Sequence, residues 1–299
     1  MSSINDINPI LPAKRVLFVG MPSTGKTSFL AALQHYVDAD ISSKEWRQYQ
    51  YASDTEYLNR IHHRWLSCEE QPRTVLEQTA PSRVEIYLEE IASGEKLVLN
   101  VPDVEGEIFS QQWEERTWSN QYEELVTAAS GILLFINPST VIMPVLLTGI
   151  DALYNEFISD EDSEVKDWAP NLAPTQVAIV DILEVHKSYI NKEIIPISII
   201  ISAWDTVLID SPHTSPEEWL ALTLPLLHQY LTANDNHLPT KIFGISAQGG
   251  DFSQQAILEK LRQLDQPAER VIVQEGTSIS NNISAPVHWI LKTWKHHLA

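Results

Sequence analysis

The chain has 299 residues, 43% hydrophobic and 20% charged, a balance typical of a globular protein with one large core. Its 40 acidic and 20 basic side chains give a formal net charge of −20, which disfavours nucleic acid and membrane surfaces as partners, because both attract basic patches. Cys68 is the single cysteine, so no disulfide forms within the chain. Without a signal-like segment or an apolar run long enough to span a bilayer, we expect a cytoplasmic protein.

Apolar runs and helical spacings alternate along most of the chain after a polar segment, 1–13, which we expect to be a flexible arm. Runs of the kind found in strands buried on both faces occur at 16–19, 131–136, 194–201 and 241–245, and two further strands are predicted over 83–89 and 96–101, joined by a turn at Ser93-Gly94. Helices are predicted over 25–37, 109–129, 174–189, 216–231 and 253–264. This alternation predicts one α/β domain over 14–299: a mostly parallel six-stranded sheet with helices on both faces.

Three segments look like additions to that domain. Residues 42–81 are polar and aromatic, with helical spacing at Tyr57, Ile61 and Trp65, and we interpret them as an elaborated loop region. Residues 137–173 contain a run of carboxylates, which predicts an acidic insertion. Residues 284–299 carry an apolar stripe at helical spacing, which predicts a C-terminal helix packed on the core.

A phosphate-binding loop is predicted at residues 20–27, where GMPSTGKT fits the pattern G-x-x-x-x-G-K-[ST] between a strand and a helix. The glycines allow backbone N–H groups to point at phosphate oxygens, and the following helix adds its positive dipole end. Lys26 would reach the β- and γ-phosphates, and the Thr27 hydroxyl would coordinate Mg²⁺. The predicted phosphate-binding residues are Gly20, Ser23, Thr24, Gly25, Lys26, Thr27 and Ser28.

A second phosphate-site element follows the predicted strand 96–101. Asp103 would hold Mg²⁺ through water, and with Gly106 it forms D-x-x-G, a pattern typical of the γ-phosphate sensor of GTPases. The Gly106 N–H would bond the γ-phosphate and release it on hydrolysis, which would order and disorder a loop.

Two loops at the ends of later strands predict the base preference. Asp205, in Ser202-Ala203-Trp204-Asp205, stands where GTPases have [NT]-K-x-D and would accept hydrogen bonds from guanine, while the Ala247 N–H of Ser246-Ala247-Gln248 would meet the guanine O6. The first match is partial. Ala203 replaces the lysine that covers the purine, and Ser202 replaces the Asn or Thr that braces the phosphate loop. Trp204 would either stack on the base or be buried.

The order of these motifs resembles the translation-factor-like (TRAFAC) class of P-loop GTPases. More closely, the chain is similar to the bacterial double-GTPase family, second type, at 72–74 (PRT), 103–107 (DVEGE), the helix 175–183 and 285–289 (APVHW). The resemblance implies a Ras-like fold, GTP or GDP with Mg²⁺ as ligands, and a switch that acts with a partner GTPase or effector protein in bacterial conflict or antiviral defence.

The resemblance also implies roles for residues near the γ-phosphate. Thr74 would complete the coordination of Mg²⁺ as the first-switch threonine, with Thr79 as a rival. Arg73 would act as an arginine finger in cis, or would simply be solvated. Glu107 stands where many relatives have the glutamine that orients the attacking water, so its carboxylate would either orient water or slow hydrolysis.

These observations predict a regulatory GTPase that acts through a protein partner. A pseudo-GTPase, which holds nucleotide without turning it over, is the alternative, because Glu107 and the altered base motif depart from the usual pattern. An ATPase ranks third.

Overall fold

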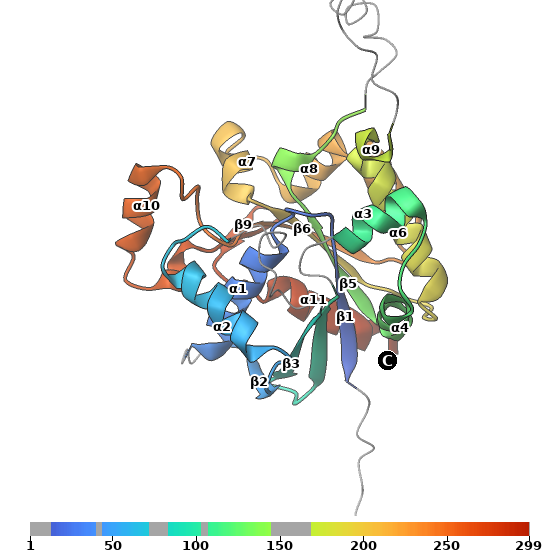
Figure 1. Ribbon diagram of the computed structural model, residues 1–299, viewed down its shortest axis with the longest axis horizontal. Helices are drawn as coiled ribbons and strands as arrows, with labels where there is room; N and C mark the ends of the chain where they lie inside the picture. The colour runs from blue at the N-terminus through green and yellow to red at the C-terminus, as the bar shows by residue number, and fades with distance from the viewer. Residues whose placement is uncertain (1–12, 40–43, 72–82, 103–106, 145–168, 299) are drawn as a thin grey trace, which may run out of the picture.

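The computed structural model describes residues 13–39, 44–71, 83–102, 107–144 and 169–298, and within these residues nine strands form one sheet (Figure 1). The strand order is β2-β3-β4-β1-β5-β6-β7-β8-β9. Strands β4, β1, β5, β6 and β7 are parallel, whereas β2, β3, β8 and β9 pair antiparallel with their neighbours. The strands are β1 (Lys14–Val19), β2 (Trp46–Gln50), β3 (Val84–Glu90), β4 (Lys96–Val101), β5 (Gly131–Ile136), β6 (Ile197–Ser202), β7 (Thr240–Ser246), β8 (Ile272–Glu275) and β9 (Ser278–Ser280).

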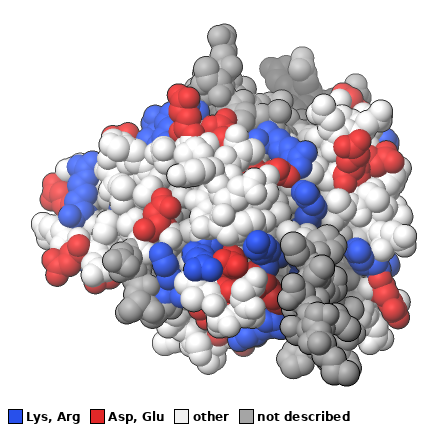
Figure 2. All heavy atoms as spheres, turned by 90° about the horizontal axis from the view of Figure 1, so that it is seen from below, with Lys and Arg blue, Asp and Glu red and all other residues white. Residues whose placement is uncertain are grey.

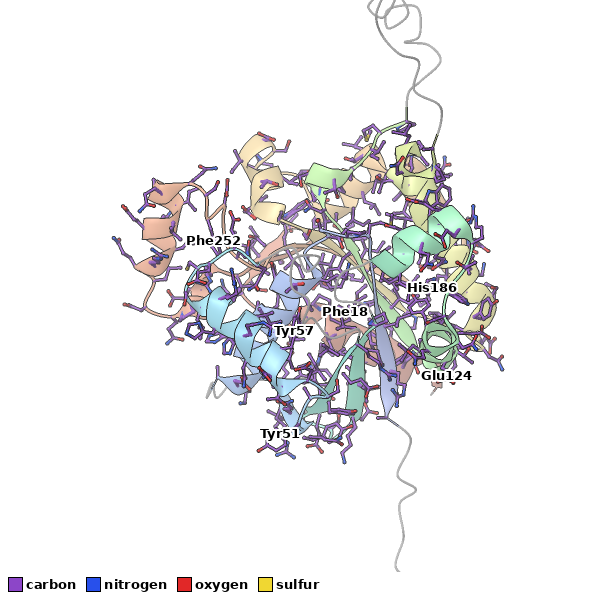
Figure 3. All side chains as sticks on the ribbon, viewed as in Figure 1. Phe18, Tyr51, Tyr57, Glu124, His186 and Phe252 are labelled. Atoms are coloured by element: carbon purple, nitrogen blue, oxygen red, sulfur yellow. The ribbon has the colours of Figure 1, made fainter. Side chains whose placement is uncertain are left out.

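Helices cover both faces of the sheet, so successive residues of its central strands are buried on opposite sides. In β1, Val16 and Phe18 pack with α1, α2 and α11, while Leu17 and Val19 pack with α3, α4, α6, α7, α8 and α9. Phe18 lies near the middle of the ribbon, stacked on Phe135 of β5 at 5.1 Å between ring centroids (Figure 3). The helices are α1 (Lys26–Asp38), α2 (Thr55–Leu66), α3 (Glu107–Glu115), α4 (Asn120–Ala128), α6 (Thr175–Tyr189), α7 (Trp204–Asp210), α8 (Pro216–Thr223), α9 (Pro225–Ala233), α10 (Gln255–Arg262) and α11 (Ala285–Leu298).

The mostly parallel α/β sheet with helices on both faces is as predicted, but it is wider than the six strands expected. The six central strands, β3 to β7 in the sheet, agree with the prediction, and β2, β8 and β9 extend the two edges. Strand β2 reads WRQYQ with Trp46 as its one fully buried residue, so it lacks the alternation that reveals a strand. Strands β8 and β9 are short, and all three residues of β9 are exposed.

Two predicted long helices are each divided in two. The helix expected over 109–129 is α3 and α4, and α4 starts afresh where Ser119 caps the Tyr122 N–H. The helix expected over 216–231 is α8 and α9. It breaks at Leu224, because Pro225 begins α9 and disfavours a helical residue before it.

Helix α11 packs on the sheet through Val287, Ile290, Leu291 and Trp294. Its Lys295 bonds Glu90 at the end of β3 at 3.1 Å. Seen from below, Lys and Arg are interspersed with Asp and Glu on the surface (Figure 2). Among the described residues, none of the helices is long and apolar enough to cross a membrane.

Candidate nucleotide-binding site

The loops that follow β1, β5, β6 and β7 meet at one edge of the sheet, because these strands are parallel neighbours. Together they line a cavity of about 510 Å³. The predicted nucleotide-binding residues that line it are Ser23, Thr24, Gly25, Lys26, Thr27, Ser28, Ser202, Asp205, Ser246 and Ala247. The structure therefore brings three of the predicted loops, 20–27, 202–205 and 246–248, into one site.

The phosphate loop, residues 20–27, is wound tightly against the ends of β5 and β6. A Cβ atom on Gly20 would lie 2.9 Å from the Phe135 carbonyl oxygen, so Gly20 packs behind the cavity and does not line it. Gly25 has a φ of +85°, and a Cβ there would lie 2.9 Å from the Cβ of Ser202. Both close approaches require glycine.

Lys26 begins α1, and its ammonium is held inside the phosphate loop. Its Nζ donates to the carbonyl oxygens of Gly20 at 2.6 Å and Met21 at 2.9 Å, and the residue is 5% exposed. The Phe109 ring of α3 lies 5.8 Å from the same nitrogen. Gly25 is the N-cap of α1 and has no side chain that could accept a hydrogen bond. The N–H groups of the first turn of α1 therefore receive no side-chain cap from Gly25.

Most residues predicted near the γ-phosphate lie outside the described residues. These are Arg73, Thr74, Thr79, Asp103 and Gly106. Of the predicted Mg²⁺ ligands, Thr27 is described; it lines the cavity directly after Lys26, and a hydroxyl oxygen suits this hard cation. Strand β4 ends at Val101 beside β1, two residues before Asp103, and Glu107 begins α3.

The turn from β6 into α7 points the side chains of Trp204 and Asp205 in different directions. Ala203 adopts a left-handed conformation with φ +47°, after which Asp205 lines the cavity. Trp204, a predicted nucleotide-binding residue that would stack on the base or be buried, is fully buried, and its Nε1 donates to Gln274 Oε1 at 2.8 Å. It packs against Gly244 of β7, so it supports the site from behind and does not stack on a base.

We use the name base loop for residues 246–249, the second segment predicted to contact the base. Ser246 is 1% exposed, and its Oγ accepts the Gly249 N–H at 3.0 Å, which closes the turn. The Ala247 carbonyl accepts a buried hydrogen bond of 2.8 Å from Trp65 Nε1 of α2. Helix α2, part of the elaborated region 42–81, therefore holds the base loop in place.

Several residues that line the cavity were not predicted from the sequence. They are Gln71, Asn137, Thr206, Gly250 and Asp251. Asn137 directly follows a buried strand, and this pattern in the sequence indicates a position at the ligand edge of a parallel sheet. Hydrogen bonds from Ser253 and Gln254 lower the pKa of the Asp251 carboxyl, which stays ionised at the rim.

A family model named Double-GTPase 1 matches residues 17–290. The chain belongs to the Double-GTPase 1 family. The resemblance to double-GTPase proteins is thus confirmed, and the family is the first type, whereas the motifs resemble the second type. Membership identifies a GTPase-like domain and implies guanine-nucleotide binding. No curated protein matches the chain.

Several solved structures are also similar to this chain. A bacterial selenocysteine-specific elongation factor, EF-Sec, is 12% identical with a TM-score of 0.36, covering 83% of this chain and 27% of that one. The signal recognition particle receptor SRb–GTP/SRX complex from Chaetomium thermophilum is 12% identical with a TM-score of 0.40, covering 80% and 92%. The GTP-bound Ski7 GTPase-like domain from S. cerevisiae is 16% identical with a TM-score of 0.41, covering 80% and 43%.

Proposed function

We propose that this member of the Double-GTPase 1 family is a GTP-binding switch that hydrolyses GTP and signals through a protein partner. The observation that carries the proposal is the single cavity lined by the phosphate loop, Asp205 and the base loop. Its volume of about 510 Å³ falls within the range of small-molecule and cofactor sites.

Phosphates would bind at the phosphate loop. Lys26 would move its Nζ from the carbonyls of Gly20 and Met21 to phosphate oxygens, which replaces neutral acceptors by charged ones. Mg²⁺ would be held by Thr27 together with Thr74 and Asp103, and it would offset negative charge on the phosphates.

Guanine would bind between Asp205 and the base loop. The Asp205 carboxylate would accept hydrogen bonds from N1–H and the exocyclic amine, and adenine lacks this pair of donors. Ala203 has no stem to cover the purine face, so we expect weaker base binding than in GTPases that have lysine there.

Hydrolysis would proceed by in-line attack of water on the γ-phosphorus, breaking its bond to the bridging oxygen and releasing GDP and phosphate. Gly106 would sense the γ-phosphate, Glu107 would orient the water, and Arg73 would offset charge that develops on the phosphoryl group. A partner GTPase or effector protein would read the two nucleotide states, and the switch would act in bacterial conflict or defence systems.

A pseudo-GTPase is the second candidate. Two sequence features favour it: the carboxylate of Glu107 replaces a neutral amide beside the γ-phosphate, and Ala203 shortens the base motif.

A nucleotide titration followed by phosphate release tests both candidates. GTP, ATP and xanthosine triphosphate are titrated on the wild type and on Asp205→Asn, with Mg²⁺ present. We expect the wild type to prefer GTP and the variant to shift towards the xanthine base, because an amide can donate where the carboxylate accepted. Equal binding of ATP and GTP, or an unchanged preference in the variant, would show that Asp205 does not read the base.

Lys26→Ala is the companion variant for the phosphate end. Loss of a buried charge-assisted contact should weaken GTP binding by on the order of 100-fold. Unchanged affinity would overturn the proposed site. GTP binding without phosphate release, with or without a partner, would identify the pseudo-GTPase.

A further inference from the structure

Asn137 stands directly after β5, beside the phosphate loop, and its side-chain amide is held at both ends. Its Nδ2 donates to the Ser23 carbonyl oxygen at 2.9 Å. Its Oδ1 accepts the Ser139 N–H at 3.0 Å and the Ser139 hydroxyl at 2.9 Å. Because a backbone N–H can only donate, the contact with Ser139 fixes which end of the amide faces Ser23.

The residue that Asn137 holds has an unfavourable backbone conformation. Ser23 has a φ of +61°, in the left-handed region that side chains with a Cβ rarely adopt. The carbonyl and the next N–H of a trans peptide point in opposite directions, so fixing the Ser23 carbonyl also fixes the direction of the Thr24 N–H. That N–H belongs to the loop whose N–H groups would bind phosphate.

The residue that would brace this loop in the usual base motif does something else here. Ser202 stands in the position of that Asn or Thr, and its hydroxyl donates to the Ile136 carbonyl at 3.3 Å. Ser202 also packs under Gly25, with no room for a Cβ between them. From the neighbouring strand ends, the side chain that hydrogen-bonds the phosphate loop is therefore Asn137, directly after β5, and not Ser202 of β6.

We propose that Asn137 is a positioning residue for phosphate binding: its amide holds the Ser23–Thr24 peptide in the orientation that phosphate requires. The proposal rests on the proposed function of the cavity, and it adds to it the residue that presets the phosphate loop.

Three variants distinguish the hydrogen bond from Asn137 to Ser23 from two other effects: a new negative charge near phosphate, and the contact between Asn137 and Ser139. Asn137→Ala removes both ends of the amide, Asn137→Asp keeps the acceptor for Ser139 but cannot donate to Ser23, and Ser139→Ala leaves the contact with Ser23 in place. We expect both Asn137 variants to bind Mg²⁺-GTP and GDP about 5- to 10-fold more weakly than the wild type, the range of one hydrogen bond in a preorganised loop. Ser139→Ala should bind like the wild type.

Guanosine, which lacks phosphates, is the ligand that distinguishes positioning from general damage. Its affinity should stay unchanged in all three variants, since the base end of the cavity is not braced by Asn137. A loss of guanosine affinity equal to the loss of GTP affinity would overturn the proposal. So would a loss confined to Asn137→Asp, because it would then reflect charge repulsion of phosphate.

Hydrogen exchange of the ligand-free protein gives a readout that needs no nucleotide. The peptide containing residues 20–27 should exchange faster in both Asn137 variants than in the wild type and in Ser139→Ala. If the wild type bound no nucleotide, the proposed function would be wrong. Hydrogen exchange of residues 20–27 would still show whether Asn137 holds the phosphate loop. If wild type and Asn137 variants bound GTP equally and exchanged equally, only the role of Asn137 would fail.

Discussion

The phosphate loop is held mainly by its own neighbours in the sequence, whereas the base loop is held by residues far away in the chain. Lys26 and Thr24 bond carbonyls three to six residues before them. The base loop receives its bond from Trp65, 182 residues away. A motif specifies most contacts of the first loop, to which Asn137 adds a hydrogen bond from 114 residues away, while the second loop depends on how distant elements pack.

The packing behind the base loop is dense and polar. The Arg270 guanidinium lies 3.8 Å from the centre of the Trp65 ring and donates to the Trp65 carbonyl and, at 2.7 Å, to the Cys68 sulfur. Gly249 turns the base loop against the Arg270 backbone, where a Cβ would come within 2.4 Å of its carbonyl oxygen. Trp65 is thus clamped between Arg270 and the loop that it supports.

The largest loss of stability should come from Gly244→Ala, which disturbs the packing of Trp204 behind the base end of the cavity. A Cβ on Gly244 would lie 2.3 Å from the Trp204 ring, and this ring is fully buried and bonded to Gln274. It cannot move aside, so the substitution should destabilise the fold by roughly 3 kcal/mol. Urea unfolding measures the loss.

Gly94→Ala is the matched control for that substitution. Gly94 lies in the turn between β3 and β4 with a φ of +72° and nothing within 4 Å of an added Cβ, so only backbone strain of about 1 kcal/mol applies. Equal losses in the two variants would mean that Trp204 is not fixed against β7.

A smaller and more selective effect is expected from Trp65→Phe. The change removes the donor to the Ala247 carbonyl and part of a buried ring, which should cost about 2 kcal/mol of stability. The preference for GTP over ATP should fall about fivefold, since one supporting hydrogen bond of the base loop is lost. Affinity for inorganic tripolyphosphate, which binds without a base, should not change.

Trp46→Phe provides the control for Trp65→Phe. Trp46 in β2 is equally buried, but its Nε1 has no hydrogen-bond partner among the described residues. The same ring volume is removed without a lost bond to the base loop. A fall in base preference with Trp46→Phe as large as with Trp65→Phe would refute the specific role of the Trp65 contact.

The same contrast explains what could be predicted from the sequence. The buried strands at 16–19 and 131–136 and the loop at 20–27 follow from local patterns, and the structure has them. The contact of Trp65 with Ala247 could not be predicted, because spacing within one segment carries no information on a partner so distant. The sequence does not decide whether Trp204 stacks on the base or is buried, since the outcome depends on Gly244 in a neighbouring strand. The position of Asn137 at the ligand edge follows from the sequence, but its contact with Ser23 depends on the strand order, which places β5 beside β1.

The smallest effect should be the loss of stability on acidification. It tests whether base preference depends on the stability of the whole domain or only on local packing. His186 of α6 is fully buried, on the face opposite α2 and Tyr57 (Figure 3). Its Nδ1 donates to the Ile182 carbonyl at 2.6 Å, so its Nε2 accepts from the Tyr122 hydroxyl at 2.5 Å.

Burial lowers the pKa of His186 from 6.5 to about 4, so the folded protein keeps it neutral while the unfolded chain protonates below 6.5. Stability is therefore full above about pH 6.5 and falls between 6.5 and 4, by about 1.4 kcal/mol at pH 5.5 relative to pH 7.5. Burial also lowers the pKa of His35 and His62, which adds to the loss in the same direction. Urea unfolding at the two pH values measures it, and His186→Gln, which has one donor and one acceptor but no titration in this range, should lose less on acidification. If the ratio of GTP to ATP affinity stays constant between the two pH values while stability drops, the base loop depends on the local contact with Trp65 and not on the stability of the whole domain.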